Sequence, residues 1–270
     1  VDDAELEAFM GQMIGFMTGG AVCLGIWLGD RLGLYRAMAG AGALTADEVA
    51  ERTGCNARLV REWLDGQVAA GVVRRDDDTY ALPPEQALAL ADEDSPVFLA
   101  RGMNVFGSIF MDVDKIAQAF RGTGALSWGD HHPCLFSGTE WMFRTGYRAN
   151  LATAWIPALD GVDDRLHGGG RVADVGCGHG ASTIVMAEAF PEAAFTAIDP
   201  HEPSVRTAGE RARDAGVDDR VSLQVADAKS YTGTYDLICF FDCLHDMGDP
   251  VGAARHAREH LTEDGTVLLV

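Results

Sequence analysis

Four aspartates follow four successive apolar runs in the second half of the chain. They are Asp174, Asp199, Asp227 and Asp242, which come after the runs Val172–Ala173, Ala194–Ile198, Val221–Val225 and Tyr235–Phe241. Short apolar runs of this kind predict buried parallel strands, and open α/β sheets bind ligands at the carboxyl ends of their strands. Each acid taken alone is equally consistent with a helix cap or a solvated turn. Together they predict that one edge of the sheet binds a ligand.

A glycine-rich turn follows the first of these aspartates. It reads Gly176, Cys177, Gly178, His179 and Gly180, and a predicted helix, Ala181–Phe190, comes next. Glycines let the backbone approach a nucleotide-like ligand, and the helix start offers free N–H groups to it. The glycines also fit a dinucleotide fingerprint, but the Asp174 carboxylate would repel a pyrophosphate and would pair with an ammonium group. The expected ligand therefore carries a positive amino group next to a nucleoside.

The later strand ends supply groups for that nucleoside. Asp199 lies 21 residues after Gly178 (199 − 178), close to the spacing of a ribose-binding acid at the end of a second strand. At the third strand end, Asp227 and Ala228 are placed to meet an adenine amino group. Pro200, after the second strand, and Asp242 with Cys243, after the fourth, complete the predicted cofactor edge.

These motifs, in this order, resemble those of class I S-adenosylmethionine-dependent methyltransferases. The matching segments read D-V-G-C-G-H-G from Asp174, A-I-D-P to Pro200, V-A-D-A to Ala228 and F-F-D-C-L-H-D-M-G-D-P to Pro250. The resemblance is strong over residues 166–270. A weaker likeness over the whole chain is to bacterial small-molecule methyltransferases with an N-terminal winged-helix domain. It implies that Asp174 and the glycine loop hold the methionine end of S-adenosylmethionine, Asp199 its ribose hydroxyls, and Asp227 with Ala228 its adenine.

Methyl transfer to a hydroxyl or thiol also requires removal of a proton. His245 stands just after the fourth predicted strand, and histidine is the side chain best suited to accept a proton near neutral pH. The resemblance implies a catalytic histidine here, although similar segments occur where the histidine only walls the cofactor. Both roles stay open, and His132 is a second candidate base. A carbon acceptor would need no strong base.

Residues 96–165 are rich in large apolar and aromatic side chains. Most are expected to form helix core, but a segment between two domains is also where a substrate cleft is expected. The candidate pocket residues are Trp128, His132, Trp141, Phe143 and Tyr147. His131, His132 and Cys134 could ligate a metal, but no second cluster has ligand spacing, so no metal site is predicted.

Residues 1–95 predict a winged helix-turn-helix. Thr45 and Glu48 form a capping box, Gly54 ends that helix, and Asn56 caps the next. A hairpin, Val72–Leu82, supplies the wing around three aspartates. These 95 residues hold 17 acids and 7 bases, a net charge of −10 (7 − 17), which is the wrong sign for phosphate contacts. No nucleic-acid partner is therefore expected.

The segment Ala8–Gly29 contains no charged residue and is long enough to span a bilayer. Its glycines, the polar Gln12 and Thr18, and the lack of a basic flank favour a helix buried against another domain or subunit instead. Gly11, Gly15 and Gly19 fall on one helix face, where another helix can approach. The segment resembles the intertwined N-terminal helices of winged-helix methyltransferases, which implies a homodimer and no membrane partner.

The composition places the chain among soluble folded proteins. Net charge is −20 and hydrophobic residues make up 47% of the 270 residues. The six scattered cysteines suggest free thiols in a cytoplasmic protein. No signal peptide is apparent, and the chain ends inside a fifth apolar run, Thr266–Val270, so the sheet is expected to be incomplete.

The predicted fold is an α/β Rossmann-like methyltransferase sheet behind a helical winged-helix domain. We expect the chain to divide into three parts. Residues 1–95 form a winged-helix domain for dimerisation that also serves as a substrate lid, residues 96–165 form a helical region that lines the substrate pocket, and residues 166–270 bind S-adenosylmethionine. The predicted function is methyl transfer from that cofactor to a small, apolar or aromatic metabolite. Two rivals are a ligand-sensing transcriptional regulator on the same fold and an NAD-dependent dehydrogenase. The charge of the reading helix and wing opposes the first, and Asp174 together with the lack of a catalytic Lys/Tyr pattern opposes the second.

Overall fold

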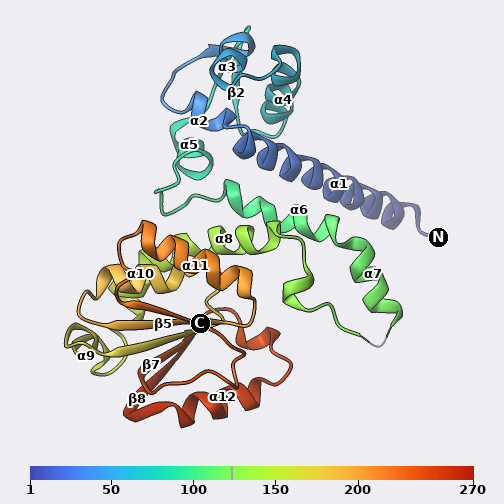
Figure 1. The fold of residues 1–270 in the computed structure, drawn as a ribbon. Coiled ribbons are helices and arrows are strands. Elements are labelled where there is room, and N and C mark those ends of the chain that lie inside the picture. Colours follow the sequence, from blue (N-terminus) through green and yellow to red (C-terminus); the bar gives the residue numbers. More distant parts are fainter. Residues whose placement is uncertain (123) are drawn as a thin grey trace. The chain divides into compact units, whose positions relative to one another are not determined.

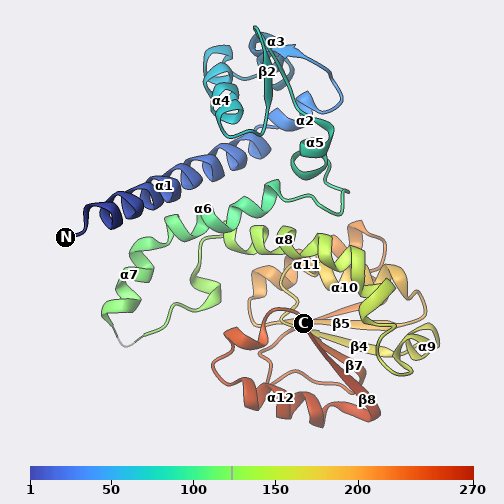
Figure 2. The same cartoon turned by 180° about the vertical axis from the view of Figure 1, so that it is seen from behind.

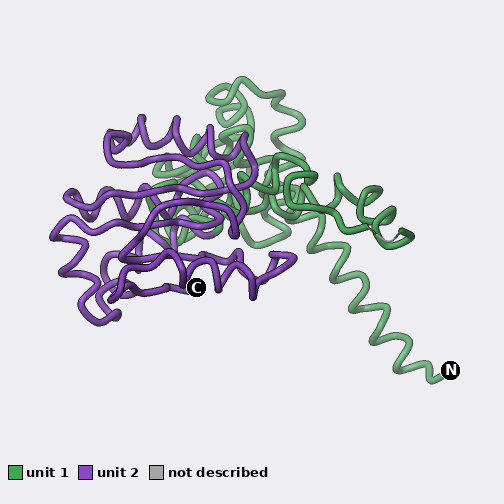
Figure 3. The backbone as a smooth tube through the Cα atoms, turned by 60° about the horizontal axis from the view of Figure 1, so that its bottom comes forward, with its two compact units in different colours: residues 1–142 green, residues 143–270 purple. Residues whose placement is uncertain are grey.

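The computed structural model describes residues 1–122 and 124–270, which divide into two compact units (Figure 3). Unit 1 comprises residues 1–142 and unit 2 comprises residues 143–270. The middle region predicted over 96–165 contributes to both units. The three-part division itself stays a prediction.

Unit 1 begins with the long helix α1 (Asp3–Arg31), drawn in dark blue in Figure 1. By length and composition α1 is apolar enough to cross a membrane, and its most apolar 18-residue window has no residue buried in the chain. This window is therefore not buried against another domain of the same chain, and its burial against a second subunit stays a prediction. Only the C-terminal part of α1 packs closely. The Gly25 carbonyl accepts a hydrogen bond from Trp63 Nε1 at 2.8 Å, and a Cβ at Gly29 would lie 2.5 Å from the Trp63 and Tyr35 rings.

The rest of the N-terminal part confirms the winged helix-turn-helix. Its elements are α2 (Leu34–Met38), β1 (Leu44–Thr45), α3 (Ala46–Thr53), α4 (Ala57–Ala69), β2 (Arg74–Asp76), β3 (Thr79–Ala81) and α5 (Pro84–Leu90). The strands form a 3-stranded antiparallel sheet in the order β1-β3-β2. The capping box of Thr45 and Glu48 is present, Gly54 ends α3 with a left-handed backbone, and Asn56 caps α4.

Helix α4 buries one stripe of its surface. Leu59, although apolar, is 63% exposed. The buried stripe instead runs through Val60, Trp63, Leu64 and Gln67, which share one face of a 3.6-residue helix. Leu59 lies beside that stripe and not on it.

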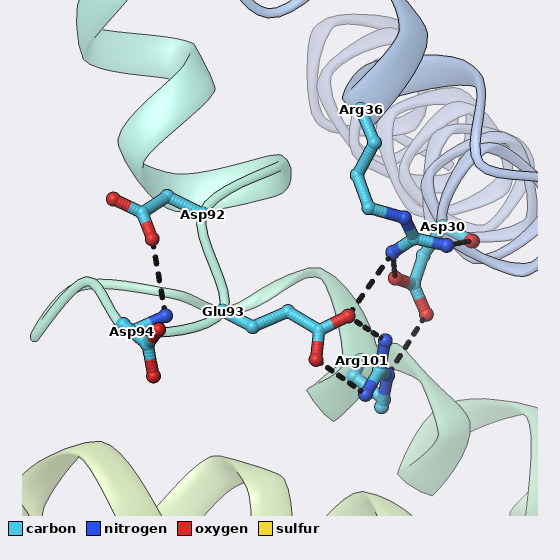
Figure 4. A network of polar contacts seen from close by, with 6 residues as sticks. All are labelled: Asp30, Arg36, Asp92, Glu93, Asp94 and Arg101. Atoms are coloured by element: carbon cyan, nitrogen blue, oxygen red, sulfur yellow. Dashed lines mark hydrogen bonds and ion pairs between the residues drawn. The ribbon is translucent and has the colours of Figure 1, made fainter.

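A network of two arginines and two acids links distant segments of unit 1 (Figure 4). Arg36 and Arg101 each contact both Asp30, at the end of α1, and Glu93. The Arg101 guanidinium also lies 4.3 Å from the centre of the Trp141 ring, a cation–π contact. Because Asp30 is 6% exposed, these pairs neutralise a buried charge where α1 meets the short helix η1 (Ala100–Met103).

Unit 1 continues through α6 (Asn104–Met111), α7 (Val113–Arg121) and the 3₁₀ turn η2 (Trp128–Asp130). Helix α8 (Cys134–Asn150) carries the chain from unit 1 into unit 2. In unit 2, the π-helical turn η3 (Leu151–Trp155) and α9 (Val162–His167) precede the sheet.

Unit 2 is a 5-stranded parallel sheet in the order β6-β5-β4-β7-β8. The strands are β4 (Arg171–Val175), β5 (Ala194–Asp199), β6 (Val221–Val225), β7 (Tyr235–Phe240) and β8 (Leu261–Leu269). Helices α10 (Ala181–Ala189) and α11 (Glu202–Asp214) cover one face, and α12 (Pro250–Glu259) covers the other (Figures 1 and 2). The order reverses at β4, so the carboxyl ends of β4 and β7 flank the topological switch point.

The predicted strands agree with the structure except at the end. The fifth strand was expected over Thr266–Val270, whereas β8 begins at Leu261. Thr262, Glu263 and Asp264 break the apolar pattern, and a register irregularity between Tyr235 and Leu237 accommodates this polar part of β8.

Candidate functional site

The loop between β4 and α10 is held in a conformation that suits glycine. Gly176, Gly178 and Gly180 have φ angles of 80°, 52° and 80°. A Cβ at Gly176 would lie 2.7 Å from Cys243 Sγ, and one at Gly180 would lie 2.9 Å from Ala208 Cβ. A Cβ at Gly178 would meet no atom of the described residues within 4 Å, so this glycine leaves open space beside the loop.

Asp174 is an incompletely paired carboxylate in the core of unit 2. It is 1% exposed, and its Oδ2 accepts hydrogen bonds of 2.6 Å from both Ser182 Oγ and Thr183 Oγ1 at the start of α10. Among the described residues, its Oδ1 has no hydrogen-bond partner. Burial raises the pKa of Asp174 to about 6, against the opposing effect of the two hydroxyls. A cationic donor at Oδ1 would remove this penalty.

Asp199 joins the end of β5 to the glycine loop. Its Oδ2 accepts from the Gly178 N–H at 3.0 Å and its Oδ1 from the His201 N–H at 2.8 Å. Burial raises the pKa of Asp199 and these backbone hydrogen bonds oppose that rise. The spacing of 21 residues therefore corresponds to a direct contact, and Asp199 lies at the predicted sheet edge.

The remaining cofactor candidates lie at the ends of β5, β6 and β7. Pro200 is an exposed residue between Asp199 and α11, and exposed Asp227 and half-buried Ala228 follow β6. Asp227 Oδ1 accepts from the Lys229 N–H at 2.6 Å. Asp242 has a φ of 49°, which is rare for a residue other than glycine and is often found at functional turns.

Two thiols line the glycine loop, that of half-buried Cys243 and that of buried Cys177. Cys243 Sγ lies 3.1 Å from the Val175 carbonyl, and burial raises its pKa to about 12. Cys177 is also buried, which raises the pKa of its thiol as well. Both are held as neutral groups that pack against the loop.

His245, the predicted base, lies in the 3₁₀ turn η4 (Leu244–Asp246), and its side chain is 62% exposed. Its Nε2 lies 3.3 Å from Asp246 Oδ1 and its Nδ1 lies 3.7 Å from Asp242 Oδ1. The structure thus places His245 at the carboxyl end of β7, between two carboxylates. Its chemical role stays a prediction.

The predicted pocket residues divide between the two units. Trp141 lies in the core of unit 1, edge-on to Phe98. Trp128 is the first residue of η2, and His132 follows that turn. In unit 2, Phe143 and Tyr147 pack together, and Tyr147 also contacts Phe241 at the end of β7. Burial, then the charge of Asp174, raises the Tyr147 pKa.

Sequence reasoning missed the partners of the predicted residues. Ser182 and Thr183 hold Asp174, and the available signal was two hydroxyl residues directly after the glycine loop at a helix start. Asp112, which binds the loop around His131, lies 19 residues from that histidine and had no sequence signal.

Two family models match separate parts of the chain. Residues 173–267 match the model described as a methyltransferase domain, and residues 20–92 match the Rv2258c-like winged HTH domain. The first match spans the glycine loop and the four aspartates. The second spans the winged-helix elements.

A curated relative and two solved structures are similar to the chain. The 27-O-demethylrifamycin SV methyltransferase of Amycolatopsis mediterranei is 36% identical over 133 residues, which cover 46% of this chain and 48% of that protein. The chain thus spans about half the length of this curated relative. The mitomycin 7-O-methyltransferase structure shares 21% identity with a TM-score of 0.72, covering 99% of this chain and 81% of that one.

Human N-acetylserotonin methyltransferase, solved in complex with SAM, shares 16% identity with a TM-score of 0.71. The alignment covers 96% of this chain and 79% of that one. At these identities the two structures establish the fold, which agrees with the strand order and the glycine loop described above. The chain thus carries a methyltransferase domain of the class I S-adenosylmethionine-dependent fold, preceded by a winged helix-turn-helix domain.

Proposed function

We propose that the chain is an S-adenosylmethionine-dependent methyltransferase that methylates a hydroxyl group of a small apolar or aromatic metabolite. The observation that carries the proposal is Asp174 Oδ1, a buried carboxylate oxygen without a partner among the described residues. An ammonium group is the natural complement of such an oxygen, whereas a pyrophosphate would be repelled.

The residues present fit this cofactor. Asp174 would hold the amino group of the cofactor, and Asp199 would hold its ribose hydroxyls. The open space beside Gly178 would let the cofactor approach the loop closely. When bound, S-adenosylmethionine supplies an electrophilic methyl group on a sulfonium. The protein then has to orient an acceptor and accept the proton of its hydroxyl. His245 is the candidate base for this step, and a wall of the cofactor site is its alternative role.

Calorimetry with S-adenosylhomocysteine and with NAD tests the cofactor. We expect the first ligand to bind and the second not to. Asp199→Ala should weaken binding by about 1–3 kcal/mol, because ribose hydroxyls would lose their buried acceptor. NAD binding tighter than S-adenosylhomocysteine would contradict the proposal.

The regulator alternative has less support. The matched domain model and the relatives named above are methyltransferases. The wing tip also carries aspartates, and residues 1–95 have a net charge of −10 (7 bases − 17 acids). We therefore infer that the winged-helix part does not bind nucleic acid.

We also infer a homodimer formed through residues 1–40. The large apolar side chains of α1 are exposed in the chain; they include Phe9, Met10, Ile14, Phe16 and Met17. Gly11, Gly15 and Gly19 have no atom within 4 Å of a built Cβ, so this face is open to a second helix. An apolar surface of this length is expected to be covered in solution. The free cysteines favour a reducing cytoplasm as its location.

A further inference from the structure

Asp112 is a buried carboxylate in unit 1, at the junction of α6 and α7. It is 1% exposed and contacts Lys115 Nζ at 2.8 Å, His131 Nδ1 at 3.1 Å and the His132 backbone N–H at 2.7 Å. Hydrogen bonds from Lys115, from the His132 backbone and from His131 lower the pKa of Asp112 to about 2. The carboxylate therefore stays ionised and accepts hydrogen bonds.

These contacts assign the tautomers of two neighbouring histidines. Since Asp112 is an acceptor, His131 Nδ1 carries a proton, and in the tautomer protonated only at Nδ1 the Nε2 atom keeps its lone pair. For His132 the opposite holds, because its Nδ1 accepts the Cys134 N–H at 3.2 Å. His131 is thus the histidine of this loop with an available acceptor nitrogen.

Lys115 supplies a positive charge beside the Asp112 carboxylate. Its ammonium contacts Asp112 Oδ1 and also donates to the Asp130 carbonyl at 2.7 Å. This lysine compensates the buried carboxylate, and the His131 imidazole donates a further hydrogen bond to it.

An aromatic surface lies beside this histidine. The Trp128 ring is edge-on to His131, with centroids 6.2 Å apart, and edge-on to Phe136 at 5.8 Å. Trp128 is 40% exposed, so part of its indole ring faces solvent. An oriented acceptor nitrogen next to an exposed indole suits a flat ring that carries a hydroxyl group.

We propose that His131 binds the hydroxyl group of a small aromatic molecule through Nε2. The hydroxyl donates its hydrogen bond to this nitrogen, Trp128 packs against the ring, and Asp112 is the positioning residue. The proposal rests on the proposed function for its ligand class, a hydroxylated small molecule.

The test uses the full chain labelled with nitrogen-15 at histidine, and 1-naphthol as the probe. We expect His131 Nε2 to give the signal of an unprotonated nitrogen at neutral pH and to shift when naphthol is added. His131→Asn keeps a donor for Asp112 in the place of Nδ1 but removes Nε2, so it should bind naphthol about tenfold more weakly with an unchanged melting temperature.

His167→Asn is the matched control, because His167 Nδ1 contacts the Asp163 carbonyl at 2.9 Å in the same way but lies on α9. It should bind naphthol as the unaltered chain does. A protonated Nε2 at neutral pH, an unshifted His131 signal at millimolar naphthol, or equal binding by His131→Asn would each overturn the proposal. Calorimetry with S-adenosylhomocysteine reports separately on the proposed function, since it needs neither naphthol nor His131.

Discussion

At the scale of single residues, Asp174 combines a cost to stability with a role in binding. Its raised pKa means that the protonated form is favoured in the folded chain. Because the folded chain binds this proton more tightly than the unfolded chain, protonated Asp174 stabilises the fold. That stabilisation is fully present below the unfolded pKa of 3.8 and is lost as pH rises through the folded pKa of about 6. At neutral pH the cofactor-free chain therefore holds a carboxylate that destabilises it.

Asp174→Asn should consequently stabilise the cofactor-free chain at neutral pH, by about 1–2 kcal/mol, and abolish S-adenosylhomocysteine binding. The full shift corresponds to about 3 kcal/mol, but the new amide N–H would lack a partner and offset part of the gain. Urea unfolding between pH 4 and pH 8 measures this. The advantage of the variant should grow with pH, and an advantage that is constant or falls would refute the assignment.

His245 is the second residue whose role a substitution can decide. The His245 side chain is exposed and lies between Asp242 and Asp246. We expect it to form part of the wall of the cofactor site. His245→Ala should then weaken S-adenosylmethionine binding severalfold, while kcat at saturating cofactor is retained. A loss of about 10²–10⁴ in saturated kcat with unchanged cofactor affinity would instead identify His245 as the base.

At the scale of elements, the packing of α1 on α6 depends on a glycine. A Cβ at Gly107 would lie 2.6 Å from the Trp27 ring of α1, so Gly107→Ala requires the indole or the helix to move. We expect a destabilisation of about 1–3 kcal/mol by thermal unfolding. Gly66→Ala in α4 is the control, since no atom lies within 4 Å and alanine should stabilise that helix by about 0.5–1 kcal/mol. Equal effects at the two sites would show that α1 does not pack there as described.

At the scale of the whole molecule, the apolar surface of α1 predicts the association state. The intact chain should be a dimer at micromolar concentration by light scattering, and Gly15→Leu should shift it toward monomer, because a large side chain would separate the paired helices. Binding to lipid vesicles is the competing outcome, given the length and hydropathy of α1. A monomeric intact chain, or a dimer that Gly15→Leu leaves unchanged, would contradict the assignment.

The sequence by itself determined the parts of this protein that depend on local pattern. Apolar runs ending in Asp174 and Asp199 located two strands and their acids, since a parallel strand buried on both faces must be continuously apolar. Caps at Thr45 and Asn56 located two helices, because a capping side chain acts within three residues of the position it serves.

Only the tertiary structure decided which groups face each other across the chain. The pairing of Asp112 with His131 and the exposure of α1 involve residues that no local pattern relates. The unpaired oxygen of Asp174 is also tertiary, because it depends on which groups fail to reach a buried site. Hydrogen bonding and burial are set by packing in three dimensions, whereas periodicity records only what one element requires of its neighbours.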